Sequence, residues 1–122
     1  MSHVVEIRTQ VRDPIAVSAA CLRLELEPPV QGSFKLFSQT VSGLAVRLPE
    51  WRYPVVFDCA TGESRFDNYE GRWGPRQQLD RFLQVYATEK VKLEARKQGR
   101  SVTEQQLADG SIRLTVGSGG VS

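Results

Sequence analysis

Two stretches of the chain combine aromatic and arginine side chains, the residue types that contribute most of the binding energy at protein interfaces. Their members are Trp51, Arg52, Tyr53, Tyr69, Arg72 and Trp73. Both stretches fall in or beside expected connections, where binding residues tend to lie. If the fold brings them to one end of a sheet, they form an aromatic and cationic patch that suits a protein partner. In the alternative interpretation, Trp51 and Trp73 close the open ends of the core.

A run of basic residues marks the second half of an expected long helix. It consists of Lys90, Lys92, Arg96, Lys97 and Arg100. Such a helix face could follow the phosphates of a single-stranded nucleic acid. Glu89 and Glu94 interrupt the run, so the simpler interpretation is a solvated face whose cations complement the helix dipole.

Residues for catalysis or metal binding are sparse. His3 is the only histidine, and Cys21 and Cys59 are far apart in the sequence. Structural zinc takes four ligands from closely spaced pairs, so we expect buried free thiols, no metal and no cofactor. Two carboxylates could perform acid–base chemistry if a cleft brought them together, but the spacing selects no pair. The candidates are Glu50, Asp58, Glu63, Asp67 and Glu70.

Composition indicates one ordinary globular domain. The chain has 122 residues, of which 40% are hydrophobic and 25% are charged, with a net charge of +2. We expect a single domain over residues 1–116 and a flexible tail over 117–122. The small net charge makes nucleic acid an unfavoured partner. No signal peptide and no apolar run of ~18 residues is present, which predicts a cytoplasmic protein without a membrane span.

The N-terminal elements follow from periodicity and capping. Alternation over Val5–Val11 predicts a strand. A helix is expected to begin at Asp13-Pro14, with Asp13 as its N-cap, and to end before Pro28-Pro29. The apolar stripe predicted for it is Ile15, Ala19, Leu22 and Leu26.

The middle of the chain predicts a meander of antiparallel strands. We expect strands near Ser33–Ser38, Leu44–Leu48, Pro54–Asp58 and Ser64–Tyr69, with the weakest pattern at Gln39–Gly43. The clearest turn is Ala60–Glu63, where Gly62 can adopt a positive φ.

The last third of the chain predicts a long amphipathic helix and a β-hairpin. The helix is expected to open at Pro75 and to end at Gly99 in a left-handed cap. Its predicted stripe is Leu79, Phe82, Leu83, Tyr86, Ala87, Val91 and Ala95. Asp109-Gly110 predicts a type I′ turn that sets Leu107 opposite Ile112.

These elements predict an α+β fold. We expect one antiparallel sheet of five to seven strands with two helices packed on one face, in the order β-α-β-β-β-β-α-β-β. Such a sheet leaves a face or an edge that self-association or a partner protein could cover.

Three segments of the sequence resemble one known family. They are residues 2–13, the helix around Phe82-Leu83 and Tyr86-Ala87, and the closing run over residues 102–114. The chain is similar to the family of the conserved plastid reading frame thirty-five, with its cyanobacterial and planctomycete-like bacterial relatives, a domain of unknown function. The resemblance implies a small protein of bacterial cytoplasm or plastid stroma, and it implies no activity, cofactor or catalytic residue.

The leading hypothesis is a non-enzymatic interaction or adaptor module, which binds a partner through an exposed sheet face and the aromatic loops. One alternative is a small enzyme or redox accessory with a pocket between the long helix and the sheet, using His3, Tyr69 or the central carboxylates. Another is a weak single-strand nucleic-acid binder that uses the basic end of the long helix.

Overall fold

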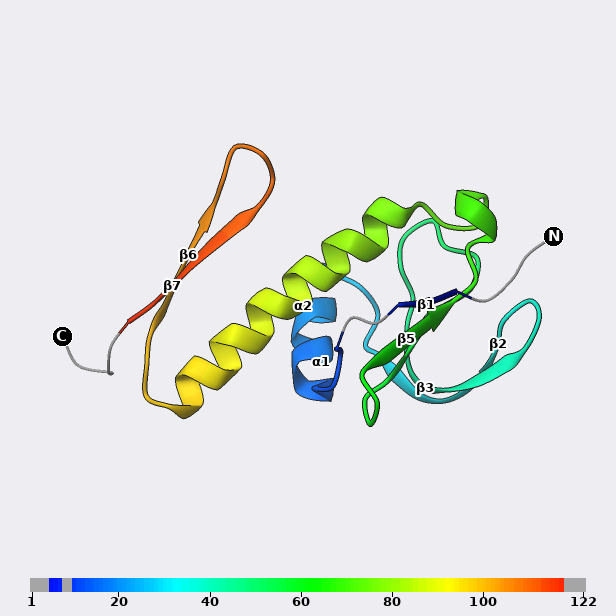
Figure 1. The fold of residues 1–122 in the computed structure, drawn as a ribbon, viewed down its shortest axis with the longest axis horizontal. Helices are drawn as coiled ribbons and strands as arrows, with labels where there is room; N and C mark the ends of the chain where they lie inside the picture. The colour runs from blue at the N-terminus through cyan, green and yellow to red at the C-terminus, as the bar shows by residue number, and fades with distance from the viewer. Residues whose placement is uncertain (1–4, 8–9, 118–122) are drawn as a thin grey trace.

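The computed structural model describes residues 5–7 and 10–117. Its elements in chain order are β1 (Val5–Ile7), α1 (Pro14–Arg23), β2 (Val30–Lys35), β3 (Thr40–Val46), β4 (Val55–Asp58), β5 (Glu63–Phe66), the 3₁₀ turn η1 (Tyr69–Gly71), α2 (Arg76–Lys97), β6 (Val102–Gln106) and β7 (Ile112–Val116). Figure 1 shows their arrangement. The α+β class and the predicted order of strands and helices are confirmed.

A five-stranded sheet forms in the order β1-β5-β4-β3-β2, and every neighbouring pair is antiparallel. In the register, Phe57 of β4 lies opposite Leu44 of β3 and Ser64 of β5. The segment with the weakest sequence pattern, Gln39–Gly43, belongs mostly to β3, which begins at Thr40. Residues 40–43 pair with β2 alone, because β4 pairs with β3 only from Leu44 to Val46.

The prediction of a single sheet is wrong, because β6 and β7 form a separate two-stranded sheet. Figure 1 shows this hairpin on the far side of α2 from the five-stranded sheet. No side chain over residues 102–116 is fully buried, whereas the sheet strands β3 and β4 are mostly buried. A hairpin needs only its own two strands to pair, so its sequence does not determine whether it joins a larger sheet.

Both helices pack on one face of the five-stranded sheet, as predicted. One core cluster joins side chains of α1 and α2 to Leu44, Val46, Val55 and Phe57. The rings of Phe57 and Phe82 are stacked with centroids 5.5 Å apart, which ties β4 to α2. The predicted stripe of α2 is therefore largely correct, although Ala87 is exposed and Val85 is buried instead.

The predicted apolar stripe of α1 is wrong at Ile15 and Leu22, although Leu26, beyond the end of the helix, packs against the core. Ile15 is 65% exposed and Leu22 is 80% exposed. The buried side chains are Ala16, Val17, Ala20 and Cys21. The helix carries apolar residues on two faces, and the smaller side chains face inward, where they allow α1 to approach α2 closely.

The turn of the β6–β7 hairpin also differs from the prediction. Gly110 has φ +90°, but Asp109 does not have a positive φ, which excludes a type I′ turn. Leu107 lies in the loop, where its amide donates to Ser111 O at 2.9 Å, and Ile112 pairs with Gln106. This is the longer hairpin loop that closes with a glycine in the left-handed conformation.

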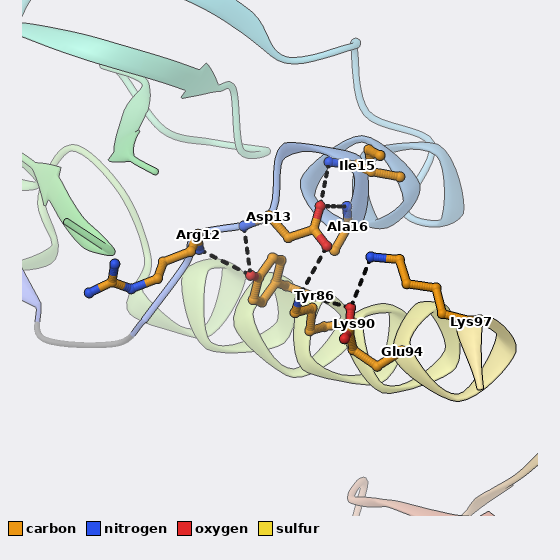
Figure 2. A network of polar contacts seen from close by, with 8 residues as sticks. All are labelled: Arg12, Asp13, Ile15, Ala16, Tyr86, Lys90, Glu94 and Lys97. Carbon is orange, nitrogen blue, oxygen red and sulfur yellow. Dashed lines mark hydrogen bonds and ion pairs between the residues drawn. The ribbon is translucent and has the colours of Figure 1, made fainter. Parts of the chain in front are cut away.

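Asp13 joins the two helices (Figure 2). Its carboxylate accepts hydrogen bonds from the amides of Ile15 and Ala16, which confirms the predicted N-cap, and from Lys90 Nζ at 3.0 Å. The Tyr86 hydroxyl accepts from the amides of Arg12 and Asp13, each at 3.2 Å. Burial raises the pKa of Asp13, but the hydrogen bonds from Lys90 and the two amides outweigh it and hold the pKa below its usual value.

Four charged residues hold the hairpin against the helices. Glu104 of β6 is paired with Arg23 of α1 and, at 2.8 Å, with Lys92 of α2. Glu89 of α2 also pairs with Arg23, at 3.0 Å. The hydrogen bonds from Arg23 and Lys92 lower the pKa of Glu104 to about 2.

Candidate interaction surface

The Trp73 ring is the centre of an aromatic cluster from three parts of the chain. Its centroid lies 4.8 Å from that of Tyr69, 5.1 Å from Phe37 and 5.6 Å from Tyr53. Phe37 follows β2, Tyr53 precedes β4, and Tyr69 and Trp73 follow β5. Tertiary structure therefore joins the two sequence stretches predicted to meet.

Two arginines stack on these rings. The guanidinium carbon of Arg52 lies 5.0 Å from the Trp73 centroid and 5.7 Å from that of Tyr53, and that of Arg72 lies 5.1 Å from Tyr69. Neither arginine has an ion pair with another described residue. We call Phe37, Arg52, Tyr53, Tyr69, Arg72 and Trp73 the aromatic–arginine surface. Stacking holds both cations in place while leaving their N–H groups to face solvent or a ligand.

Exposure makes this surface available to a partner. Phe37 is 54% exposed. Both arginines are exposed, and the three remaining rings are half-buried. Sequence reasoning missed Phe37, because its only local signal was its position at the end of an expected strand.

Backbone hydrogen bonds fix the loop that carries Arg72 and Trp73. Asn68 O accepts from the amides of Gly71 at 3.0 Å and Trp73 at 2.9 Å. The amide of Arg52 donates to Trp73 O at 2.7 Å and joins the two stretches directly. The aromatic–arginine surface is therefore held by its backbone before any ligand binds.

Three consecutive residues of this loop have a positive φ: 47° at Tyr69, 54° at Glu70 and 94° at Gly71. For the two residues with a Cβ, this conformation costs about 1–3 kcal/mol each. Strain of this kind persists only where surrounding contacts over-determine the backbone, and it is found most often at functional sites.

Trp51 does not join the aromatic–arginine surface. It is 9% exposed, and its indole N–H donates to Pro75 O at 2.9 Å. Its ring packs edge-on against Phe66 and covers Gly74, where a Cβ would lie 2.3 Å from the ring. Trp51 therefore fits the alternative interpretation, in which its side chain closes an open end of the core.

The candidate acid–base residues differ in burial and in their contacts, and two of them, Asp58 and Glu63, are cross-strand partners of β4 and β5. Asp58 caps the turn through the amide of Ala60, and Glu63 pairs with Arg65 at 3.5 Å. Glu50 and Glu70 are exposed. Asp67 is fully buried; its Oδ1 accepts from the Tyr69 amide, and its Oδ2 has no hydrogen-bond partner among the described residues.

Within residues 5–7 and 10–117, no group of three His, Cys, Asp or Glu side chains is placed to hold a metal ion. His3 lies outside the described residues. Both cysteines are free: burial raises the pKa of Cys21 to about 11, and burial with the nearby carboxylates of Asp58 and Asp13 raises that of Cys59. Neither thiol has the depressed pKa of a reactive cysteine.

A small depression lies where α2 meets the rim of the sheet. Its volume is about 140 Å³, and it is lined by Leu24, Leu26, Leu48, Pro49, Gln78 and Arg81. None of the residues named for an enzymatic site lines it. It is also smaller than the ~300 Å³ at which ligand pockets usually begin.

The predicted basic run splits into two groups. Lys90 and Lys97 both pair with Glu94 at 3.2 Å, and Lys90 also pairs with Asp13. The remaining three residues, Lys92, Arg96 and Arg100, line one groove with Ser101 and Val102.

Comparisons with protein-family models, with curated proteins and with solved structures find no match. None of the helices among the described residues is long and apolar enough to cross a membrane.

Proposed function

We propose that the protein is a non-enzymatic interaction module that binds a protein partner, or a second copy of itself, through the aromatic–arginine surface. The observation that carries the proposal is the position of Arg52 and Arg72, stacked on Trp73 and Tyr69 without an ion pair among the described residues. Trp, Tyr and Arg are the residues most enriched at binding hot spots.

The second face of the sheet supports the same proposal. A small apolar cluster lies there, and it contains no helix residue. It consists of Leu36, Val41, Ala45 and Val56, with Phe34 and Tyr53 packed against it. Tyr53 thus links this face to the aromatic–arginine surface. The four cluster residues are already buried, so the apolar area that a partner could cover on this face is chiefly that of Val30 on the edge strand β2, which is 57% exposed.

The family and the compartment of the protein are also part of the proposal. The family of the plastid reading frame thirty-five is proposed from the sequence resemblance alone. A reducing compartment such as bacterial cytoplasm or plastid stroma is proposed because both cysteines are free.

Affinity capture from native lysate tests the proposal. We expect a stoichiometric partner to bind the wild type, and Arg72→Glu or Trp73→Ala to weaken the purified complex by about thirtyfold or more, the effect of losing a hot-spot residue. Arg113→Glu, on the exposed face of β7, is the matched control and should bind normally. Equal binding by all four proteins, with the fold retained, would reject the proposal.

A further inference from the structure

The groove at the C-terminal end of α2 has the features of an anion site. Its volume is about 320 Å³, roughly that of ten waters in the liquid. Three of its five lining residues are cations: Lys92, Arg96 and Arg100. Because Lys92 and Arg96 lie 16 and 20 residues after the start of α2 at Arg76, the groove is about 24–30 Å along the helix from the loop that carries Trp73.

The end of α2 holds these cations in position. Lys92 and Arg96 are four residues apart and share a helix face. The chain then reverses at Gly99, which has φ +69°, and the amide of Arg100 donates to Ala95 O at 2.8 Å. This αL cap, which the sequence predicts, reverses the chain so that Arg100 and Ser101 line the same groove as Arg96. The amide of Gly117 donates to Ser101 O at 2.7 Å and fixes the groove wall.

The two arginines are not neutralised. Lys92 pairs with Glu104 and Glu89, so its charge is largely compensated. Arg96 and Arg100 have no ion pair with any described residue, and both are exposed. The cap satisfies the carbonyls of Ala95 and Arg96 in the last turn of α2, which reduces the repulsion that a helix C-terminus exerts on an anion.

We propose that this groove binds a compact phosphate-bearing anion, held by the guanidinium groups of Arg96 and Arg100 with the Ser101 hydroxyl as a further donor. Two planar guanidinium groups that line one groove suit the tetrahedral oxygens of a phosphate or diphosphate, which accept paired hydrogen bonds. The site is separate from the aromatic–arginine surface, and its occupancy does not depend on a protein partner.

Titration of purified full-length protein with pyrophosphate, followed by amide chemical shifts, tests the site. We expect saturable shifts at residues 96–102, weakened by added salt. Arg96→Gln and Arg100→Gln should each reduce the affinity about tenfold or more, because each removes charge-assisted hydrogen bonds. Neither change breaks an ion pair among the described residues, so both variants should keep the wild-type melting temperature.

Arg113→Gln serves as the control, because Arg113 is an exposed arginine on the same hairpin that does not line the groove. A short oligothymidylate, titrated in parallel, identifies the source of the bound phosphate. If it binds more tightly than pyrophosphate and loses affinity with Arg96→Gln and Arg100→Gln, the phosphate belongs to a nucleic-acid backbone. If only pyrophosphate binds, the ligand is a small anion. Shifts without saturation, or an equal loss in Arg113→Gln, would overturn the proposal.

Discussion

Arg52 and Trp73 are joined twice: the amide of Arg52 donates to Trp73 O at 2.7 Å, and its guanidinium carbon lies 5.0 Å from the centroid of the Trp73 ring. The backbone bond fixes two segments that lie about 20 residues apart, and the stacking holds a cation above the indole. A charged side chain held in one conformation loses less entropy when it binds. The pair is therefore preorganised for recognition.

Gly74→Ala should destabilise the protein. A Cβ at this position would lie 2.3 Å from the Trp51 ring, which is itself packed in the core, so neither group can move freely. We expect a loss of about 1–3 kcal/mol in the free energy of unfolding, measured with urea. Gly32→Ala is the control, because its Cβ would meet the Phe34 ring at an ordinary 3.5 Å. Equal effects of the two changes would contradict the packing described here.

Tyr86→Phe should also lower stability. Its hydroxyl accepts from the amides of Arg12 and Asp13, which would lose their acceptor at the start of α1. The expected loss is about 1–2 kcal/mol by chemical denaturation. Tyr53→Phe is the matched control, since no described residue bonds to its hydroxyl. A Tyr86→Phe protein as stable as the wild type would show that these hydrogen bonds make no net contribution to the free energy of unfolding.

Glu104 should make stability depend on acid pH. Its pKa falls from the usual 4.5 to about 2 in the folded protein, so its contribution is complete above pH ~4.5 and is lost as the pH falls through 2. At pH 7, Glu104→Gln should cost about 1 kcal/mol, a value that allows for solvent screening of a partly exposed pair. The cost should shrink toward pH 2.

Urea unfolding at pH 7 and pH 2.5 measures this difference. Glu27→Gln is the control, because Glu27 is exposed and has no ion pair with a described residue. A cost for Glu104→Gln that stays constant over this range would mean that the pairs with Arg23 and Lys92 do not couple to folding.

Local rules predicted much of the fold from the sequence. Asp13 caps α1, Gly62 turns between β4 and β5 with φ +82°, and Gly99 ends α2. Each depends on a few neighbouring residues, which is why capping and turn chemistry identify it. The order of strands and helices follows from these boundaries.

The packing between segments that are far apart in the sequence was not predictable in the same way. Ile15 and Leu22 are apolar, yet the face of α1 that enters the core carries the smaller side chains, because the residues packed around the helix determine which face fits. The hairpin forms where it was expected, but its register differs by one residue and it is separate from the five-stranded sheet. At the candidate site, the clustering of Arg52 and Trp73 was an expectation from residue type, and Phe37 was missed because its contact with Trp73 spans the sheet.

Site-specific photocrosslinking tests the central claim most directly. A benzophenone amino acid replaces Phe37, beside Trp73, and in a matched protein it replaces Leu22, an 80% exposed residue on α1. We predict one discrete adduct from position 37 in native lysate, at the mass of a partner or of a second copy. That adduct should be lost with Arg72→Glu, and none should form from position 22. Adducts that persist with Arg72→Glu, or that form equally from both positions, would contradict the assignment of this surface.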